Sequence, residues 1–529
     1  MKKLAPIFIL ILISTGTGLV AGEVADFSLR PEVYFRFEVE DRSDLLAVTR
    51  VVSIDKVIGD TVYAYANQRE FDEFRLMVKD IEILIPSSLR YKPRMMDSAE
   101  KSKSWDAYPT YTAYREMMYR FQTDFPDICR IDSIGHSVNN RAILFAVISD
   151  NVRQKEAEPE VMYTSSMHGD ELTGYVLMLR LIDYLLSNYQ TDKRITGLVN
   201  NLEIWINPLS NPDGAYFLSD TSVYGATRCN ANGVDLNRNF PSPAEGEHPD
   251  GRLWQPETVA MMELAERQNF VLSANFHGGA EVLNYPWDCW QRVHADNDWL
   301  IWLCRQYADT AQSRSPSGYL TDLNNGITNG WSWYPTFGNR QDYMTYFQNG
   351  REITIEISAV KMPLSSTLPH YWTYNRDALI NFLGAVQQGI HGQIRSDDFS
   401  NIRIGIVNHE RDNSRVVPDA DFGDYYRLCL PGNYRLEISD GASAIVLENV
   451  NVDKGMTSVA NAVIGDRIPG DIDANGKINA ADLVLLKNFI LNRLTPNSTE
   501  FQSADWNNDG AINNADMELM RAFLMNLGP

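Results

Sequence analysis

Thr164–Gly174 has the sequence TSSMHGDELTG and joins an apolar run, Glu160–Ser165, to a helix that we expect to begin at Asp170-Glu171 and to continue to Leu186. Within it, His168 and Glu171 are spaced so that an imidazole and a carboxylate can bind one metal ion. Zinc suits this pair, and a catalytic zinc also needs a third protein ligand and an open position for water. Alone the motif is weak, because the same spacing occurs at the solvated start of ordinary helices. The motif predicts a junction between a strand and a helix, and it does not identify the third metal ligand.

Length and composition predict a large globular protein. The chain has 529 residues, enough for three or four domains, and 44% of them are hydrophobic. Its net charge of −22 argues against nucleic acid, whose phosphates require a basic surface, and favours a solvated acidic surface. Part of this charge belongs to acidic loops near the C-terminus. We expect a monomer without a nucleic-acid partner.

The N-terminus indicates export. Residues 1–22 place Lys2 and Lys3 before a short apolar run that ends in small residues, which is typical of a cleaved secretory signal rather than a membrane span. No other stretch is apolar for long enough to cross a bilayer. The five cysteines are few and odd in number, which disfavours a disulfide scaffold, although pairing of Cys289 with Cys304 stays open. We therefore expect a secreted, extracellular protein, associated with a scaffold or the cell surface.

Residues 23–95 predict a small α+β module with the order β-α-β-β-α-β. It contains no cluster of catalytic residue types. It is either a packing domain or a pro-segment that covers the next domain before activation. Arg90, Lys92 and Arg94 would then lie in an exposed linker open to trypsin-like cleavage. The expected strands are Val33–Val39, Val52–Val57, Thr61–Ala66 and Ile81–Ile85, and the expected helices are Ser43–Thr49 and one capped by Asn67 that runs to Met77.

Strands and helices alternate over residues 105–390, which predicts one large α/β domain with a mixed central sheet flanked by helices. Residues that follow strands in such a sheet collect at its carboxyl edge, where binding sites form. Residues 391–465 contain short strands separated by turn residues and predict a β-sandwich. The expected elements of the α/β domain are a helix in Tyr108–Phe125 and strands at Ala142–Ile148, Glu160–Ser165, Leu202–Ile206 and Ile353–Ser358.

Residues 468–529 contain an internal repeat that predicts two calcium loops. Asp471-Ile-Asp-Ala-Asn-Gly476 recurs as Asp505-Trp-Asn-Asn-Asp-Gly510, and each copy has an acid at its twelfth position. Single Asp-Gly turns are common, but two copies in register are not. The expected ligands are Asp471, Asp473, Asn475, the Lys477 carbonyl and Asp482 in the first loop, and Asp505, Asn507, Asp509, the Ala511 carbonyl and Asp516 in the second, with Asn479 and Asn513 at the ninth positions. Helices Ala481–Asn492 and Ala515–Asn526 should follow.

His277 is the best candidate for the third zinc ligand. It follows the apolar strand pattern of Val271–Gly279 and precedes glycines that allow close approach of the backbone. The other histidines lie in polar or loop surroundings. Glu356 stands in an otherwise apolar strand, where a buried carboxylate either pairs or acts as a general base. The outward face of an edge strand is the alternative.

These motifs, with NPDG at Asn211–Gly214, GVDLNRNF at Gly233–Phe240 and the run from Asn325 to Ser358, resemble the zinc metallocarboxypeptidases. The chain is most similar to their regulatory branch (carboxypeptidases N, M, D and E), in which a transthyretin-like domain follows the catalytic one. The resemblance covers about Trp105–Ile464. It implies one catalytic zinc on His168, Glu171 and His277.

The same resemblance implies roles for further residues. Glu356 matches the general acid/base, and Arg228 matches the arginine that polarises the scissile carbonyl. Asn237 and Arg238 match the pair that binds the terminal carboxylate of the substrate. Tyr334 matches the tyrosine that closes over bound substrate, although it could be one more structural aromatic in a crowded segment.

Two positions match the pocket of the basic-specific branch. Asp288 and Gln341 correspond to its acidic residue and its partner, which implies preference for a C-terminal Lys or Arg. The alternative is that Asp288 only caps a turn after Pro286. The repeat near the C-terminus is similar to a type I dockerin, which binds a cohesin of a multi-enzyme scaffold. Lys487 and Arg521 occupy equivalent places in its helices, as cohesin contacts or as ordinary surface charges.

The sequence thus predicts a secreted zinc carboxypeptidase that acts on peptide C-termini and is tethered through a cohesin to a cellulosome-like scaffold. One alternative is a peptidase of peptidoglycan stem peptides, whose diaminopimelate side chain also carries an amine. Another is an inactive binding module that kept the fold, against which the presence of Glu356 and Arg228 argues.

Overall fold

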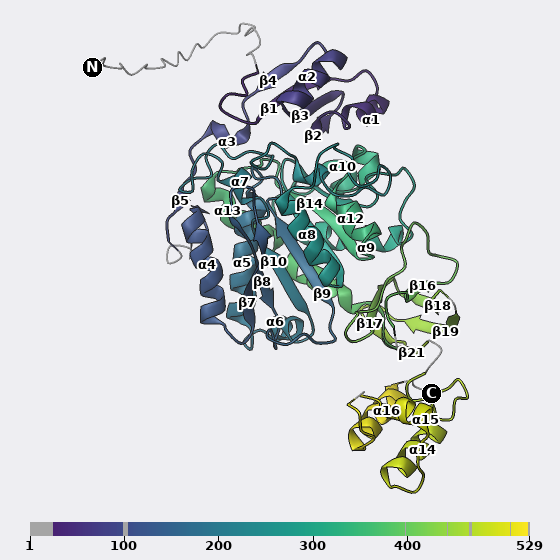
Figure 1. Ribbon diagram of the computed structural model, residues 1–529. Coiled ribbons are helices and arrows are strands. Elements are labelled where there is room, and N and C mark those ends of the chain that lie inside the picture. The colour runs from purple at the N-terminus through teal and green to yellow at the C-terminus, as the bar shows by residue number, and fades with distance from the viewer. Residues whose placement is uncertain are drawn as a thin grey trace, which may run out of the picture.

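The computed structural model describes residues 25–98, 104–396, 398–441, 443–464, 468–507 and 509–526. Four units follow one another along the chain: an N-terminal module, a large α/β unit, a β-sandwich and a C-terminal helical segment (Figure 1). The signal predicted for residues 1–22 lies outside the described residues. None of the described helices is long and apolar enough to cross a membrane.

The N-terminal module (residues 25–98) has a four-stranded antiparallel sheet in the order β2-β3-β1-β4. Asn67 caps α2 as predicted, because its side chain accepts the Glu70 N–H while the Glu70 carboxylate accepts its own N–H. The β-α-β-β-α-β order is confirmed. The elements are β1 (Glu32–Glu38), α1 (Leu45–Val48), β2 (Ser53–Ile58), β3 (Thr61–Asn67), α2 (Gln68–Met77), β4 (Glu82–Leu84), α3 (Ser87–Arg90) and β5 (Met95–Met96).

The α/β unit is built on an eight-stranded sheet in the order β13-β12-β14-β11-β9-β10-β8-β7. Its centre, β10-β9-β11-β14, is parallel, and β12 and β8 flank this centre with antiparallel pairing, so the sheet is mixed as predicted. The strands are β7 (Cys129–His136), β8 (Ala142–Ile148), β9 (Glu160–Ser165), β10 (Glu203–Asn207), β11 (Phe270–His277), β12 (Glu281–Tyr285), β13 (Ile327–Asn329) and β14 (Arg351–Ile357).

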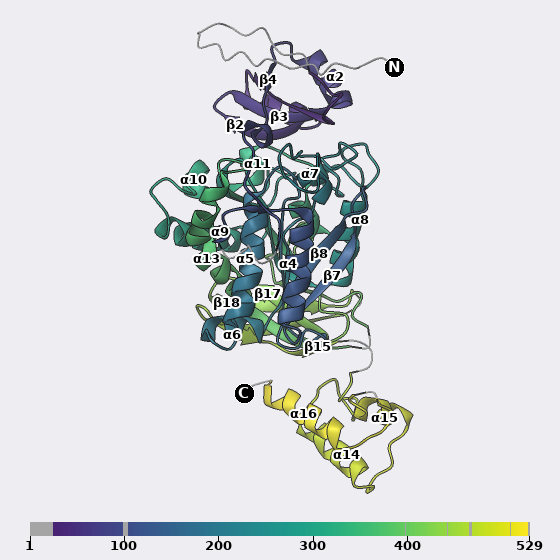
Figure 2. The same ribbon diagram turned by 90° about the vertical axis from the view of Figure 1, so that its left-hand side faces the viewer.

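Helices cover both faces of this sheet (Figure 2). Along β8, Leu144 and Ala146 join the core beneath one set of helices, while Phe145 and Val147 join a second core that includes Met261 of α8. A strand buried on both faces has a continuous apolar run, which explains the sequence of β8. The longer helices are α4 (Tyr111–Asp124), α5 (Thr173–Asn188), α8 (Pro256–Arg267), α9 (Asn297–Ser313) and α13 (Leu368–Gly384), and the shorter ones are α6 (Lys193–Val199), α7 (Pro212–Ala215), α10 (Asp322–Gly326), α11 (Gly330–Trp333) and α12 (Arg340–Tyr346).

Two helix starts differ from the sequence expectation. Helix α5 begins at Thr173, not at Asp170, because residues 166–172 form a turn in which Ser166 donates its hydroxyl to the Glu171 carbonyl and the Leu172 N–H bonds the Lys361 carbonyl. Helix α4 begins at Tyr111 rather than Tyr108, because Tyr108–Pro109 forms β6 and pairs with β5. The turn before α5 places Glu171 at the carboxyl edge of the sheet.

The β-sandwich consists of two sheets, β17-β15-β20 with β21 beside β15, and β16-β18-β19. Its first strand starts at Gly389, at the junction with the α/β unit. The strands are β15 (Gly389–Arg395), β16 (Arg403–Ile406), β17 (Asp424–Leu428), β18 (Gly432–Ser439), β19 (Ala444–Val452), β20 (Thr457–Val459) and β21 (Ala462–Val463).

The C-terminal helical segment contains α14 (Ala480–Ile490) and α16 (Asn514–Asn526), close to the expected helices, and a third helix, α15 (Ser498–Ala504), that the sequence analysis did not predict. All five cysteines are buried and free, so the pairing of Cys289 with Cys304 that the sequence left open is not formed.

Candidate functional site

His168, Glu171 and His277 converge at the carboxyl edge of the sheet. The Nδ1 atoms of the two histidines lie 3.0 Å apart, and each faces one carboxylate oxygen of Glu171, at 2.9 and 2.8 Å. All three side chains are buried, and burial lowers the pKa of His277 to about 4, so its ring is neutral and keeps a lone pair. Ligand atoms that converge in this way can hold a metal ion.

Outer partners orient both histidines. Asp235 Oδ1 lies 3.1 Å from His168 Nε2, and the Asn275 carboxamide lies 2.8 Å from His277 Nε2. A carboxylate or amide behind a histidine ligand fixes its tautomer and is typical of metal sites. A His₂Glu set with such support fits zinc. The sequence analysis gave Asp235 no role, although it lies inside the GVDLNRNF motif and was open to detection.

Glu356 lies on β14, between β12 and β11, and its backbone is in register with His277. The edge-strand alternative is therefore wrong. Among the described residues, no group bonds its Oε2 atom. Burial, and then the negative charge of Glu171, raise the pKa of Glu356 well above its ordinary value. A bound cation would oppose this shift, which leaves a carboxylate suited to accept and return a proton.

Two arginines border the metal cluster. Arg228 Nε lies 2.9 Å from Asp235 Oδ2, and its Nη1 lies 3.5 Å from Glu171 Oε1. Arg238 is buried, yet within the described chain it has no ion-pair partner, and its Nε atom bonds nothing. Among the described residues, the guanidinium makes one hydrogen bond, which Nη1 donates to the Asn237 carbonyl over 2.8 Å. A buried guanidinium without a counter-ion is costly, so this position is prepared for an anion.

The predicted specificity residues Asp288 and Gln341 contact each other, and of the two only Asp288 lines the cavity around the metal cluster. Asp288 Oδ1 accepts hydrogen bonds from Gln341 Nε2 at 3.0 Å and from Asn284 Nδ2 at 3.1 Å. The amide oxygens of Asn284 and Gln341 bond no group of the described residues. Burial, and then Asp342, raise the pKa of Asp288 well above its ordinary value. Asn284 was missed, although it lies four places before Asp288 in the same segment.

Gly330 leaves the space that Asp288 needs. A Cβ atom at Gly330 would lie 1.5 Å from Asp288 Oδ1. The turn alternative for Asp288 does not account for its position, since its side chain points into a cavity lined by the metal cluster, Arg238 and Glu356. Tyr334 lines the same cavity, and its hydroxyl lies 3.5 Å from the Ile54 carbonyl of the N-terminal module.

The N-terminal module lies over this edge of the sheet (Figure 1). Asp55 on β2 extends into the cavity, where its Oδ1 lies 2.6 Å from Lys361 Nζ. The Tyr65 hydroxyl donates to Asp170 at 2.8 Å, and the Glu32 carboxylate accepts the Arg228 N–H at 2.8 Å. With the module present, the cavity measures about 30 Å³, room for a water molecule or two and not for a peptide.

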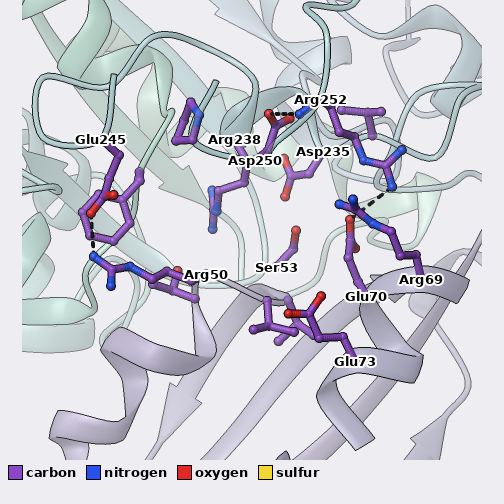
Figure 3. Close-up of a pocket in the computed structure, with 16 residues that line it drawn as sticks. Arg50, Ser53, Arg69, Glu70, Glu73, Asp235, Arg238, Glu245, Asp250 and Arg252 are labelled. Carbon is purple, nitrogen blue, oxygen red and sulfur yellow. Dashed lines mark hydrogen bonds and ion pairs between the residues drawn. The ribbon is translucent and has the colours of Figure 1, made fainter. Parts of the chain in front are cut away.

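A second, wider pocket of about 170 Å³ follows the seam between the module and the α/β unit. Figure 3 shows Arg50, Glu70 and Glu73 on the module facing Asp235 and Arg238 on the opposite wall. Ion pairs cross this seam, among them Arg50 with Glu245 at 2.5 Å. The contact between the two units is therefore polar and charged around its margin.

The two predicted calcium loops have the same hydrogen-bond pattern. Asp471 accepts two backbone N–H groups of its own loop, and so does Asp505, while the twelfth-position acids Asp482 and Asp516 each accept three. Oxygens of Asp471, Asp473 and Asp482 come close enough together to hold one ion.

Backbone N–H groups also bond the side chains at the fifth positions of these loops, Asn475 and Asp509, and that of Asn507. The Lys477 and Ala511 carbonyls each accept from the asparagine two places later. The ninth-position residues Asn479 and Asn513 accept the N–H two residues ahead, at Ala481 and Ala515. These two side chains therefore cap helices and would reach an ion only through water.

Comparison with known proteins identifies two parts of the chain. Residues 114–378 match the family model described as zinc carboxypeptidase, and residues 469–525 match the dockerin type I domain. Mouse carboxypeptidase M is 35% identical over 336 residues, which cover 60% of this chain and 74% of that protein. Human carboxypeptidase D is 33% identical over 452 residues, or 81% of this chain, but the match spans only 29% of its length.

Among solved structures, carboxypeptidase A from Helicoverpa armigera aligns with a TM-score of 0.52 at 18% identity, covering 67% of this chain and 97% of that one. This likeness shows the fold. The relatives named carboxypeptidase D and M belong to the branch that the motifs indicated. The chain therefore belongs to the zinc carboxypeptidases, and its residues 469–525 form a type I dockerin domain.

Proposed function

We propose that the protein is a secreted carboxypeptidase that removes single C-terminal residues, preferably Lys or Arg, from peptides. The observation that carries this proposal is the buried, unpaired guanidinium of Arg238, placed in one cavity with the zinc-type ligand set and Glu356. An endopeptidase has no need of a buried cation at the end of its site. An enzyme that binds a free α-carboxylate does.

His168, Glu171 and His277 would hold one zinc ion. When bound, zinc polarises the scissile carbonyl and acidifies the attacking water. Glu356, with its free oxygen in the cavity, takes the proton of that water and returns it to the leaving amine. Arg228 stabilises the negative charge that develops on the carbonyl oxygen, while Arg238 and Asn237 hold the terminal carboxylate and Tyr334 closes over the substrate.

The end of the cavity favours a cationic side chain. Asp288 supplies a negative charge, and the unpaired amide oxygen of Asn284, which lines the same cavity, supplies an acceptor without a competing donor. A Lys ammonium or an Arg guanidinium has several donors for these oxygens, whereas an apolar side chain would leave them unsatisfied.

The N-terminal module acts as the pro-segment. Asp55 occupies the catalytic cavity, and the remaining space excludes a peptide. Arg90, Lys92 and Arg94, at the end of the module, are exposed to a trypsin-like protease. Arg94 is partly held, since its N–H bonds Ser365 Oγ at 3.0 Å and its guanidinium pairs with Asp106 at 2.5 Å. Because Pro93 follows Lys92 and blocks cleavage there, cleavage after Arg90 would sever the module from the α/β unit.

The dockerin tethers the enzyme to a scaffold outside the cell. Two calcium ions, one in each loop, would be held by the carboxylates, amide oxygens and backbone carbonyls of the loops and would order α14 and α16. Lys487 and Arg521 are exposed at equivalent places on these helices and are available to a cohesin surface. Binding should therefore require calcium.

The test is release of free Lys or Arg from N-blocked dipeptides by the zinc-loaded chain, before and after limited trypsin treatment. We expect activity after treatment, its loss with a chelator, and its loss in Glu356→Gln. Cleavage of peptidoglycan stem peptides without release from dipeptides would favour that alternative substrate. Absence of release from both substrates, with zinc bound, would mean that the chain is an inactive binding module.

A further inference from the structure

The catalytic cavity holds one carboxylate that does not belong to the α/β unit. Asp55 Oδ1 of the module lies 2.6 Å from Lys361 Nζ and 3.8 Å from Arg228 Nη1. The Asp55 side chain is 4% exposed, and within the module it bonds only the Tyr34 hydroxyl, at 3.2 Å. The negative charge of Asp55 is thus balanced by two cations of the α/β unit, Lys361 and Arg228. The space beside these two cations is large enough for a carboxylate, and Asp55 fills it.

Lys361 is held in position by that unit. Its Nζ lies 2.6 Å from Glu171 Oε1 and 3.7 Å from Asp170 Oδ1, and its side chain is 5% exposed. Gly279 leaves the neighbouring space open. A Cβ atom at Gly279 would lie 3.6 Å from Lys361 Cε and 3.7 Å from Asp55 Oδ1, so a longer side chain would compete for the place of the Asp55 carboxylate.

The strand pairing gives the direction of a substrate through the site. Asn284, beside the Asp288 pocket, is in register with Thr354 of β14, and Glu356 follows two residues later. Lys361 comes after the end of the strand, past Glu356 and next to Glu171. The Asp288 pocket and Lys361 therefore lie on opposite sides of the reacting groups. If the released residue occupies the Asp288 pocket, Lys361 faces the part of the substrate that is retained.

We propose that Lys361, with Arg228 beside it, forms a subsite for an acidic side chain on the retained part of the substrate, at the residue before the scissile bond or the one preceding it. In the intact chain Asp55 occupies this subsite. The inference rests on the proposed carboxypeptidase function and adds a second element of specificity to it. The favoured substrates are peptides that end in a basic residue preceded by an acidic one.

The size of the effect follows from the environment of Lys361. An ion pair at the solvent-exposed rim of a binding site adds little to the free energy of binding, whereas a fully buried ion pair adds much more. This ammonium is buried but already has carboxylate neighbours, so a substrate carboxylate should raise kcat/KM about tenfold over the isosteric amide.

The experiment compares N-blocked peptides ending in Lys that carry Glu or Gln at the penultimate position or the one before, on the zinc-loaded chain after trypsin treatment. We expect a ratio of kcat/KM for Glu over Gln of about ten in the wild type and in Lys361→Arg, and about one in Lys361→Met. Lys193→Met, an exposed lysine of α6, is the matched control and should keep the wild-type ratio. Because each ratio is taken within one variant, loss of zinc or of overall activity cancels.

A binding measurement makes the result independent of turnover. Calorimetric Kd values for the same peptides on Glu356→Gln should favour Glu over Gln by the same factor. A Glu-to-Gln ratio near one in the wild type, or a ratio that survives in Lys361→Met, overturns the subsite. Failure of the proposed function has a different signature, which is release of Lys from no peptide at all.

Discussion

Replacement of Asp288 by Asn tests the specificity pocket with a change of charge at constant shape. In the wild type, Asn284 and Gln341 both donate to Asp288 Oδ1, and the Asp288 carboxylate lines the cavity. In the Asn variant the single carbonyl oxygen can satisfy those two donors, and the amide then turns its own N–H groups towards the bound cation. In the other orientation, the N–H groups of the new amide face the N–H groups of Asn284 and Gln341, so donors oppose donors. Both orientations therefore disfavour binding of a cation.

The magnitude follows from the depth of the site. Asp288 is 5% exposed, so a bound Lys or Arg side chain is desolvated beside it. Two unit charges ~3 Å apart at an effective dielectric constant of about 20 interact by roughly 5 kcal/mol. Desolvation, and the cost of ionising a carboxyl whose pKa burial and Asp342 have raised, offset part of this. We expect a loss of about 3 kcal/mol, or roughly 150-fold in kcat/KM.

The assay measures kcat/KM for N-blocked dipeptides ending in Lys, Arg or Leu on the trypsin-treated, zinc-loaded chain. Asp288→Asn should lower the values for Lys and Arg by that factor and leave the value for Leu within about threefold, since the terminal carboxylate and Glu356 are unaffected. Asp298→Asn, an exposed acid of α9, is the matched control. An equal loss for all three substrates would show that Asp288 supports the fold of the site rather than its preference, and the reasoning would fail.

Other parts of the account can be tested in the same way. In the uncleaved chain, Asp55→Asn removes a buried ion pair with Lys361 worth about 2 kcal/mol, so hydrolysis of dipeptides by this chain should become roughly thirtyfold faster. Hydrolysis as slow as in the uncleaved wild type would refute the blocking role of Asp55. Gly330→Ala should displace the Asp288 carboxylate and lower kcat/KM for Lys substrates about 100-fold, with folding checked by melting temperature; full activity would contradict the close approach. Because the pKa of Asp288 is raised and only its ionised form attracts a cation, the preference for Lys over Leu should increase with pH above the ordinary value of 3.8; a preference that is flat or falls with pH would be inconsistent with this sign. Removal of calcium should abolish cohesin binding and reduce the helical signal of α14 and α16, as should Asp482→Asn combined with Asp516→Asn; binding that persists in a calcium chelator would exclude the loops as its basis.

Local sequence predicts two kinds of site residue, namely polar residues near the end of an apolar strand and residues in a repeated loop. His277 and Glu356 each stand in a strongly apolar run, where a polar side chain is costly to bury unless it binds a ligand or takes part in chemistry, and the calcium loops repeat a fixed spacing. The start of α5 was placed too early because the turn before it depends on the Lys361 carbonyl, which lies far away in the sequence.

The contacts of the N-terminal module could not be predicted. Asp55 lies in a strand whose period fixes only which face it occupies, and nothing in that pattern names Lys361 as its partner. The same holds for Asp235, whose two oxygens bond His168 and Arg228 at once. Pairings of this kind come from the docking of whole units, and only the structure contains them.

The most direct test of the central claim is release of free Lys from an N-blocked dipeptide by the trypsin-treated chain, measured with one equivalent of zinc, with chelator, and in Glu356→Gln. The account predicts release with zinc, none with chelator, and recovery when zinc is restored. It predicts no release by Glu356→Gln even though this variant binds zinc normally. Release that is insensitive to chelator, or equal release by Glu356→Gln, would contradict the assignment of the metal cluster and Glu356 as the catalytic centre.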